Sequence, residues 1–286
     1  MKLIMTDSNH QDTVNQQTVK SYSQRGAHNY EDPMNKNFLY GDITVRFIEK
    51  IPIRERDQVV LDIGCGTGFI FDELAHVFHA KGLQGIGVEP AKGMLNYARD
   101  KYKGDDNFSF YEGSFENIPL PDKSVDHIVS TLALHWVNSL EIAANEMRRV
   151  LNDDGYLDIL MIAKDDGAEF KKSIVAALKK HLTFKQIMGT ATLVQRARED
   201  QVHLAFSEFH EGFDIVVEEY RDVIYGTFEE HMKWWSARST PVIAEVKDKE
   251  IFMEDLRCEL DKTNTSQGIP FDTAYFHILV RSKANG

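Results

Sequence analysis

The chain has 286 residues, of which 42% are hydrophobic and 27% are charged, the balance of an ordinary globular protein rather than of a disordered or fibrous one. The length exceeds the usual size of one domain, although α/β folds of about 250 residues often form a single domain. Lys and Arg number 33 against 45 Asp and Glu, a formal net charge of −12, which disfavours nucleic acid and anionic membrane surfaces as partners.

The start of the chain and its cysteines bear on location and on metal chemistry. Residues 1–12 become polar after the first five positions, too early for a secretory signal, and no apolar run approaches the roughly 20 residues that cross a bilayer. We therefore expect a cytoplasmic protein with no membrane partner. Cys65 and Cys258 are the only cysteines. Since they lack the Cys/His spacing of a zinc site, we expect no disulfide framework and no metal.

Strands and helices alternate over residues 57–163. Short apolar runs predict buried strands, and apolar residues that recur every three to four positions predict helices. In chain order the predicted elements are strand 59–63, helix 70–78, strand 83–89, helix 91–102, strand 107–112, strand 124–131, helix 140–151, a turn at 152–155 and strand 156–163. This alternation indicates a parallel sheet covered on both faces, with its ligand site outside the carboxyl ends of the strands.

The pattern changes after residue 164. Helix formers dominate 168–210 and 228–260, whereas 213–225 and 273–281 have the composition of strands. The two late strands are expected to complete the sheet of one α/β domain. The helices between them form either a lid over the strand ends, where a substrate is selected, or additional packing. The expected division is an N-terminal arm with the cofactor core in 1–163, and the rest of the sheet with helical insertions in 164–286.

A glycine-rich segment, Leu61-Asp62-Ile63-Gly64-Cys65-Gly66-Thr67-Gly68, ends the first strand and opens the first helix. Glycines let the backbone turn sharply and approach a ligand, and free N–H groups at the start of a helix favour an anion. A dinucleotide site requires the pattern GxGxxG, but here the third glycine comes one residue early, at Gly68, and Phe69 occupies the place reserved for it. A dehydrogenase is therefore disfavoured, although it remains an alternative.

The segment Val59–Gly68 resembles the first motif of class I S-adenosylmethionine-dependent methyltransferases, in the branch that acts on small molecules. The resemblance covers roughly residues 20–163, and four further segments carry it, namely Val88-Glu89-Pro90, Gly113–Leu120, Ser130–Trp136 and Val150–Leu157. It implies a Rossmann-like, doubly wound and mostly parallel seven-stranded sheet with a helical lid. It also implies S-adenosylmethionine as cofactor and S-adenosylhomocysteine as product.

The resemblance assigns residues to the cofactor. Asp62 would receive its ammonium group, the backbone near Gly64 and Gly66 would meet its amino-acid end, and the oxygens of Glu89 would accept from the ribose hydroxyls. The other residues that the resemblance places at the cofactor are Tyr22 and Tyr30 of the arm, Cys65, Gly68, Pro90, Met94, Ser130 and Thr131. The alternatives are a helix cap for Asp62, a solvated charge for Glu89 and an exposed arm with incidental tyrosines.

The segment expected to meet the adenine departs from the family pattern. An acidic residue usually follows the glycine and accepts from the adenine amino group, whereas this chain has Ser114. A serine oxygen is a weaker acceptor, so Glu116 is a candidate substitute, and Phe115 is a candidate apolar wall.

His135 is the candidate catalytic residue. Leu134-His135-Trp136 follow the fourth strand at the cofactor end of the sheet. A histidine pKa of about 6.5 suits removal of a proton from a hydroxyl or amine acceptor. A carboxylate acceptor would need positioning but no base. A histidine that only packs is the alternative.

The expected acceptor site combines Trp136 with a helix that carries four further candidates, His231, Trp234, Trp235 and Arg238. Spacings of three or four residues place these side chains on one helix face. They are interpreted as an aromatic wall with a cation for an acidic group on the substrate. Packing of this helix on the sheet is the alternative.

Together these patterns predict an enzyme that transfers a methyl group to a small-molecule acceptor, with oxygen as the first choice of accepting atom. Transfer to nitrogen or carbon is an alternative. So is a module that binds S-adenosylmethionine, has lost catalysis and acts through a partner. The chain is expected to be a monomer or a homodimer.

Overall fold

The computed structural model describes residues 19–20, 22–23, 31, 38–191, 196–236, 243 and 245–283. Its elements are α4 (Gly41–Ile48), β1 (Val59–Ile63), α5 (Phe69–Lys81), β2 (Gln84–Glu89), α6 (Lys92–Lys101), β3 (Phe108–Glu112), β4 (Val125–Thr131), η2 (Leu134–Trp136), α7 (Leu140–Val150), β5 (Leu151–Ile162), α8 (Ala168–Leu178), α9 (Phe184–Ala191), α10 (Glu199–Ala205), η3 (Ser207–His210), β6 (Phe213–Gly226), α11 (Phe228–Ser236), α13 (Lys249–Asp261) and β7 (Ile269–Ser282). Two predicted site residues, Tyr30 and Arg238, lie outside the described residues.

The strands form one sheet in the order β3-β2-β1-β4-β5-β7-β6. Neighbouring strands from β3 to β5 run parallel, and β7 runs antiparallel to both β5 and β6. The predicted fold class, a doubly wound, mostly parallel seven-stranded sheet, is confirmed. Because the chain winds from β1 toward β3 on one side and from β4 toward β5 on the other, the switch point lies at the carboxyl ends of β1 and β4.

Apolar side chains cover the sheet on both faces, as parallel strands require. Along β1, Val60 packs into a cluster with residues of α4, α5 and α6. Its neighbour Leu61 points the other way, into a cluster with residues of α7 and α10. The β7 residues Ala274 and Phe276 join this second cluster. The two cores hold the glycine loop after β1 between layers that do not shift easily.

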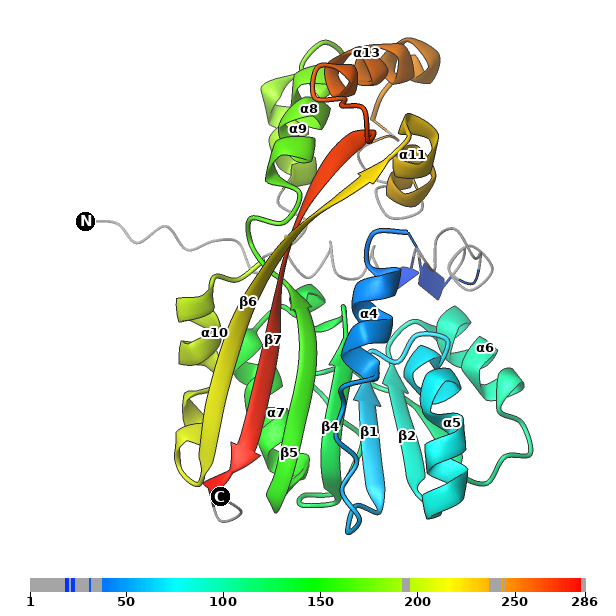
Figure 1. The fold of residues 1–286 in the computed structure, drawn as a ribbon, viewed down its shortest axis with the longest axis vertical. Coiled ribbons are helices and arrows are strands. Elements are labelled where there is room, and N and C mark those ends of the chain that lie inside the picture. The colour runs from blue at the N-terminus through cyan, green and yellow to red at the C-terminus, as the bar shows by residue number, and fades with distance from the viewer. Residues whose placement is uncertain are drawn as a thin grey trace.

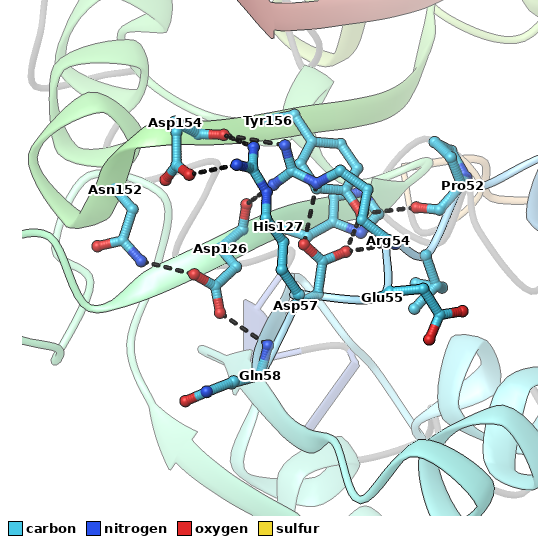
Figure 2. A network of polar contacts seen from close by, with 12 residues as sticks. Pro52, Arg54, Glu55, Asp57, Gln58, Asp126, His127, Asn152, Asp154 and Tyr156 are labelled. Carbon is cyan, nitrogen blue, oxygen red and sulfur yellow. Dashed lines mark hydrogen bonds and ion pairs between the residues drawn. The ribbon is translucent and has the colours of Figure 1, made fainter. Parts of the chain in front are cut away.

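The start of β5 differs from the prediction. The strand begins at Leu151 rather than at Tyr156, and its pairing with β4 shifts register after Val125. The predicted turn at 152–155 is therefore an irregular stretch inside the strand. Asn152 donates to Asp126 at 2.7 Å, so a neighbouring strand holds the stretch (Figure 2).

The same network closes the amino ends of the strands, opposite the glycine loop (Figure 2). The His127 Nε2 lies 2.8 Å from the Asp158 carboxylate, and the ring stacks on Tyr156 at 3.9 Å between centroids. The Arg54 guanidinium group also lies over the Tyr156 ring, with its Cζ 3.8 Å from the ring centroid. The Arg54 Nε donates to the Asp57 carboxylate. Burial lowers the pKa of His127, which favours a neutral ring. This network joins the strand starts and takes no part in the site below.

β6 and β7 pair along their whole length and form a ribbon that extends past the other strands (Figure 1). Four helices, α8, α9, α11 and α13, gather around its far end and are called the helical cap here. Aromatic side chains fill the cap, among them Phe170, Trp235, Phe252 and Phe271. The cap thus lies beyond the carboxyl ends of the parallel strands.

Candidate cofactor site

A cavity of about 500 Å³ opens at the carboxyl ends of β1, β2 and β4, where a doubly wound sheet binds its ligand. Many of the predicted site residues line it, namely Tyr22, Gly64, Gly66, Glu89, Pro90, Met94, Ser114, Phe115, Glu116, Thr131 and Trp136. Its volume suits a nucleoside-sized molecule.

The glycine loop requires glycine for steric reasons. Gly64 has φ 75°, and a Cβ there would lie 2.3 Å from the Cβ of Ala133. Gly68 has φ 88° and precedes α5, and a Cβ there would lie 2.9 Å from the ring of Tyr102. Gly68 does not line the cavity, so its part is to let the helix begin. The left-handed backbone at both positions strains any residue with a side chain.

Glu89, at the end of β2, is an acidic residue whose side chain is oriented by a hydrogen bond from the glycine loop. Its Oε1 accepts from the Ala91 N–H at 2.8 Å, and its Oε2 accepts from the Gly66 N–H at 3.0 Å. Burial raises the pKa of Glu89 to about 7, while the two N–H bonds act in the opposite direction. Each oxygen keeps acceptor capacity, so two ligand hydroxyls fit.

Asp62, in β1 just before the glycine loop, is 2% exposed and lies behind the cavity wall, outside the residues that line the cavity. No described residue donates a hydrogen bond to its Oδ1. Burial raises the pKa of Asp62 well above its usual value, and the nearby Glu89 charge raises it further. A buried acceptor without a donor is costly, and an ammonium group near both carboxylates would offset that cost. The predicted helix cap, the alternative for Asp62, is not formed at α5.

The loop after β3 carries the residues expected to meet the adenine. Phe115, 5% exposed, contributes an apolar part of the cavity wall. The Glu116 carboxylate accepts from the N–H groups of Asn138 and Ser139, each at 2.8 Å. Glu116 therefore fixes this loop to the start of α7, and the Ser114 Oγ itself accepts from the Glu116 N–H at 3.3 Å.

The N-terminal arm lies against the cavity. Val19, Lys20 and Tyr22 line it, and the Tyr22 ring packs edge-on to Trp136 at 6.4 Å. A Cβ at Gly93 of α6 would lie 2.0 Å from the carbonyl oxygen of Ser23, so the arm fits only against a glycine there.

Two predicted cofactor residues support the loop from behind. The Ser130 hydroxyl donates to the Ile63 carbonyl at 2.7 Å. Cys65 is buried, and a Cβ at Gly87 would lie 2.7 Å from its Sγ. Burial raises the pKa of the Cys65 thiol, so the group stays protonated. Neither side chain lines the cavity.

His135 also lies outside the cavity lining, although its neighbour Trp136 lines it. The His135 ring is 6% exposed, and no described residue bonds to its Nδ1. Burial lowers the pKa of His135 well below its usual value, and the charges of Arg196 and Lys171 lower it further. The ring is thus a neutral group and a weak base, and the predicted orientation toward the cofactor sulfur is not observed.

The three described candidates on α11 share a face, as predicted, but this face packs inside the helical cap. The His231 Nε2 lies 2.9 Å from the Ile269 carbonyl oxygen, so the ring donates to the β7 backbone. Trp234 lies 5.4 Å from the Phe271 ring, and Trp235 is buried as well. None of the three lines the cavity. The packing alternative describes their placement, and the predicted aromatic wall is not observed there.

Sequence reasoning missed part of the cavity wall, namely Val19, Lys20, Ala91, Leu132, Ala133, Val137 and Asn138. Leu132 has φ 55°, an uncommon conformation for a branched residue that marks the sharp exit from β4. No local pattern indicates this conformation. Its place directly after a predicted strand was the available signal.

The fold and the cavity define a class of protein that binds a nucleoside-containing cofactor at the switch point of a Rossmann-like sheet. The described residues contain no group of three or more His, Cys, Asp or Glu side chains that could hold a metal. Within the same part of the chain, no helix is both long and apolar enough to cross a membrane.

Comparisons with known proteins find a methyltransferase domain within the chain. Residues 61–159 match the family model described as a methyltransferase domain. The malonyl-[acyl-carrier protein] O-methyltransferase of Yersinia pestis is 33% identical over 144 residues, 50% of each chain. The ubiquinone/menaquinone biosynthesis C-methyltransferase UbiE of Campylobacter jejuni is 33% identical over 119 residues, 41% of this chain and 49% of that protein. The chain thus spans about half the length of these relatives.

A solved structure of Haemonchus contortus phosphoethanolamine N-methyltransferase 2, with S-adenosylhomocysteine, covers 96% of this chain and 60% of its own, with a TM-score of 0.59 and 16% identity. At this identity the likeness concerns the fold alone. In sequence, the similarity to methyltransferases rests on the matched domain at residues 61–159 and on the relatives named above.

Proposed function

We propose that the chain transfers the methyl group of S-adenosylmethionine to an oxygen atom of a small-molecule acceptor. The observation that carries the proposal is the cavity in the methyltransferase domain, with Glu89 on its wall and the unpartnered Asp62 oxygen behind it. Such a pair of carboxylates fits a ligand with hydroxyl groups at one point and an ammonium group at another.

The residues of the chain bind the cofactor, orient the acceptor and exclude water. When bound, S-adenosylmethionine supplies a methyl group on a positively charged sulfur. Glu89 holds the ribose hydroxyls, Asp62 receives the ammonium group, and Phe115 lies against the adenine. Tyr22 and Trp136 close the cavity, which keeps water from the reacting atoms. Because the acceptor and the methyl group are aligned by the walls, most of the acceleration comes from positioning.

Oxygen is the first choice of accepting atom. Of the two relatives described above, the one matched over the longer segment is an O-methyltransferase. The weakly basic, buried His135 also favours an acceptor that needs no strong base, such as a carboxylate. The formal net charge of −12 speaks against nucleic acid as acceptor. A cytoplasmic location and a monomeric or homodimeric state stay predictions.

The test is a transfer assay with S-adenosylmethionine labelled in its methyl group. The full chain is incubated with hydroxy, carboxy and amino compounds, and mass spectrometry locates the label. We expect label on oxygen, and at least about tenfold less label with the Glu89→Gln variant at limiting cofactor. Label on nitrogen or carbon would overturn the choice of atom. Tight binding of S-adenosylhomocysteine without transfer to any compound would favour a module that has lost catalysis.

A further inference from the structure

A buried polar cluster lies just after the carboxyl end of β5. At its centre is Asp166, 1% exposed. Its carboxylate accepts from the Tyr40 hydroxyl, from the Ala274 N–H at 3.1 Å and from Arg196 Nη1 at 2.7 Å. The Asp166 carbonyl accepts from the Lys171 ammonium group. The buried Asp166 therefore fixes two partly exposed cations.

Arg196 bonds to Asp166 through only one of its guanidinium nitrogens. Nη1 donates to the Asp166 carboxylate and, at 3.1 Å, to the Asp166 carbonyl. Among the described residues, none accepts from Nε or Nη2 of Arg196, and the side chain is 20% exposed. A guanidinium group presents two parallel N–H groups along such an edge, the arrangement that a carboxylate binds in a bidentate manner.

The other acidic residues near Lys171 are already engaged. Asp272 accepts from the Ala168 N–H at 3.0 Å, at the start of α8. Asp165 pairs with Arg221 at 3.5 Å on the surface. Burial lowers the pKa of Lys171 to about 8, and the Arg196 charge acts in the same direction, against the three nearby aspartates. An anion beside the two cations would relieve this desolvation and repulsion.

His135 connects the cluster to the cavity. Arg196 and Lys171 both lie near enough to act on its charge, and its Nδ1 has no partner among the described residues. Trp136, the next residue, lines the cavity. The Lys164 N–H donates to the Ala197 carbonyl at 3.0 Å, which ties the segment after Arg196 to the end of β5. The cluster therefore lies at the carboxyl edge of the sheet, as the cavity does.

We propose that Arg196 and Lys171 form an anchoring subsite for a carboxylate group of the acceptor, with His135 as a further hydrogen-bonding group near it. This inference rests on the proposed function and narrows it to acidic small molecules. It assigns the binding of an acidic group on the substrate, which the sequence predicted for Arg238, to Arg196 and Lys171. The anchored carboxylate need not be the atom that is methylated.

The test compares carboxylates with neutral compounds of the same shape. Calorimetry on the full chain saturated with S-adenosylhomocysteine measures binding of 4-hydroxybenzoate against 4-hydroxybenzamide, and of malonate against malonamide. We expect at least one carboxylate to bind about tenfold more tightly than its amide. Arg196→Lys keeps the charge and one bond to Asp166 but loses the fork, so it should reduce carboxylate affinity about tenfold and leave amide affinity unchanged.

Arg198→Lys is the matched control, because Arg198 lies two residues on and its side chain is 56% exposed. It should leave every affinity unchanged. Equal binding of both carboxylates and their amides, no carboxylate binding, or wild-type carboxylate affinity in Arg196→Lys would each overturn the subsite. These outcomes would leave the proposed function intact as long as S-adenosylhomocysteine binds the chain. If calorimetry showed no binding of S-adenosylhomocysteine, the proposed function itself would be overturned.

Discussion

Two buried carboxylates mark the cofactor site, Glu89 in the cavity lining and Asp62 outside that lining. Burial raises the pKa of both carboxylates, and the Glu89 charge raises the pKa of Asp62 further. The protein keeps this arrangement although it weakens the empty fold. A ligand that supplies hydroxyl and ammonium donors removes the cost, so affinity for the cofactor and instability of the empty site have the same origin.

The first prediction concerns Glu89→Gln. The amide keeps the size of the side chain but loses the charge that ribose hydroxyls would bind. We expect affinity for S-adenosylhomocysteine to fall by about 1.5–3 kcal/mol, measured by calorimetry. Glu112→Gln is the control, since Glu112 ends β3 with its side chain 55% exposed. Equal affinities in the two variants would contradict the assignment.

The second prediction concerns pH. The pKa of Glu89 is raised from 4.5 to about 7 in the folded protein, so the folded chain binds this proton more tightly than the unfolded chain. Stability from this group is present below pH 4.5 and is lost as pH rises toward 7. Cofactor affinity follows the opposite course, because the carboxylate is the form that accepts from hydroxyls. It should fall by about tenfold for each pH unit below the pKa.

Calorimetry with S-adenosylhomocysteine across this pH range measures the effect. The Glu89→Gln variant should show a flatter profile than the wild type. A wild-type affinity that is independent of pH below 7 would show that the charge of Glu89 does not contribute to binding.

The residues that could be predicted follow one another along the chain. Gly64, Gly66 and Glu89 stand at fixed places after predicted strands, so the topology alone brings them together. Arg196 could not be predicted, because its position depends on Asp166 and on segments distant in sequence. His135 was placed correctly after β4, but whether its ring would point into the cavity depends on packing that periodicity does not encode.

At the scale of elements, the N-terminal arm and α6 form a close pair. The carbonyl of Ser23 approaches Gly93 so closely that a Cβ would lie 2.0 Å from it. Most elements follow from their apolar periodicity, including the long ribbon of β6 and β7. The start of β5 does not, because Asn152 is held by a side chain of β4, and such contacts leave no local pattern.

The third prediction is that Gly93→Ala displaces the arm. Alanine favours the helix by up to about 1 kcal/mol over glycine, yet its methyl group cannot coexist with the Ser23 carbonyl in the present position. We expect faster hydrogen exchange in the arm at residues 19–23 and weaker binding of S-adenosylhomocysteine. Asn96→Ala, at an exposed position of the same helix, is the control. Unchanged exchange of the arm in Gly93→Ala would show that this contact is not needed.

At the scale of the molecule, Asp166 joins parts that are far apart in sequence. It binds Tyr40 near the arm, Arg196 before α10, Lys171 in the helical cap and Ala274 in β7. The seven-stranded fold could be predicted because alternating strands and helices have few solutions. The contacts of Asp166 with Tyr40 and Ala274 could not be predicted, since they join segments that are distant in sequence.

The fourth prediction is that Asp166→Ala destabilises the whole chain. The variant removes the carboxylate that pairs with Arg196 and accepts from the Tyr40 hydroxyl, and removing one partner of a buried pair costs about 3–5 kcal/mol. Urea unfolding measures the loss. Asp165→Ala, one residue away with a side chain 65% exposed, should cost less than about 1 kcal/mol. Similar losses in the two variants would contradict the role given to Asp166.

The most direct test of the whole account is a calorimetric titration of the full chain with S-adenosylhomocysteine and, separately, with NAD. The early third glycine at Gly68 and the paired carboxylates of Asp62 and Glu89 predict binding of S-adenosylhomocysteine at one site per chain and no measurable binding of NAD. Binding of NAD in preference to S-adenosylhomocysteine, or of neither, would contradict the account.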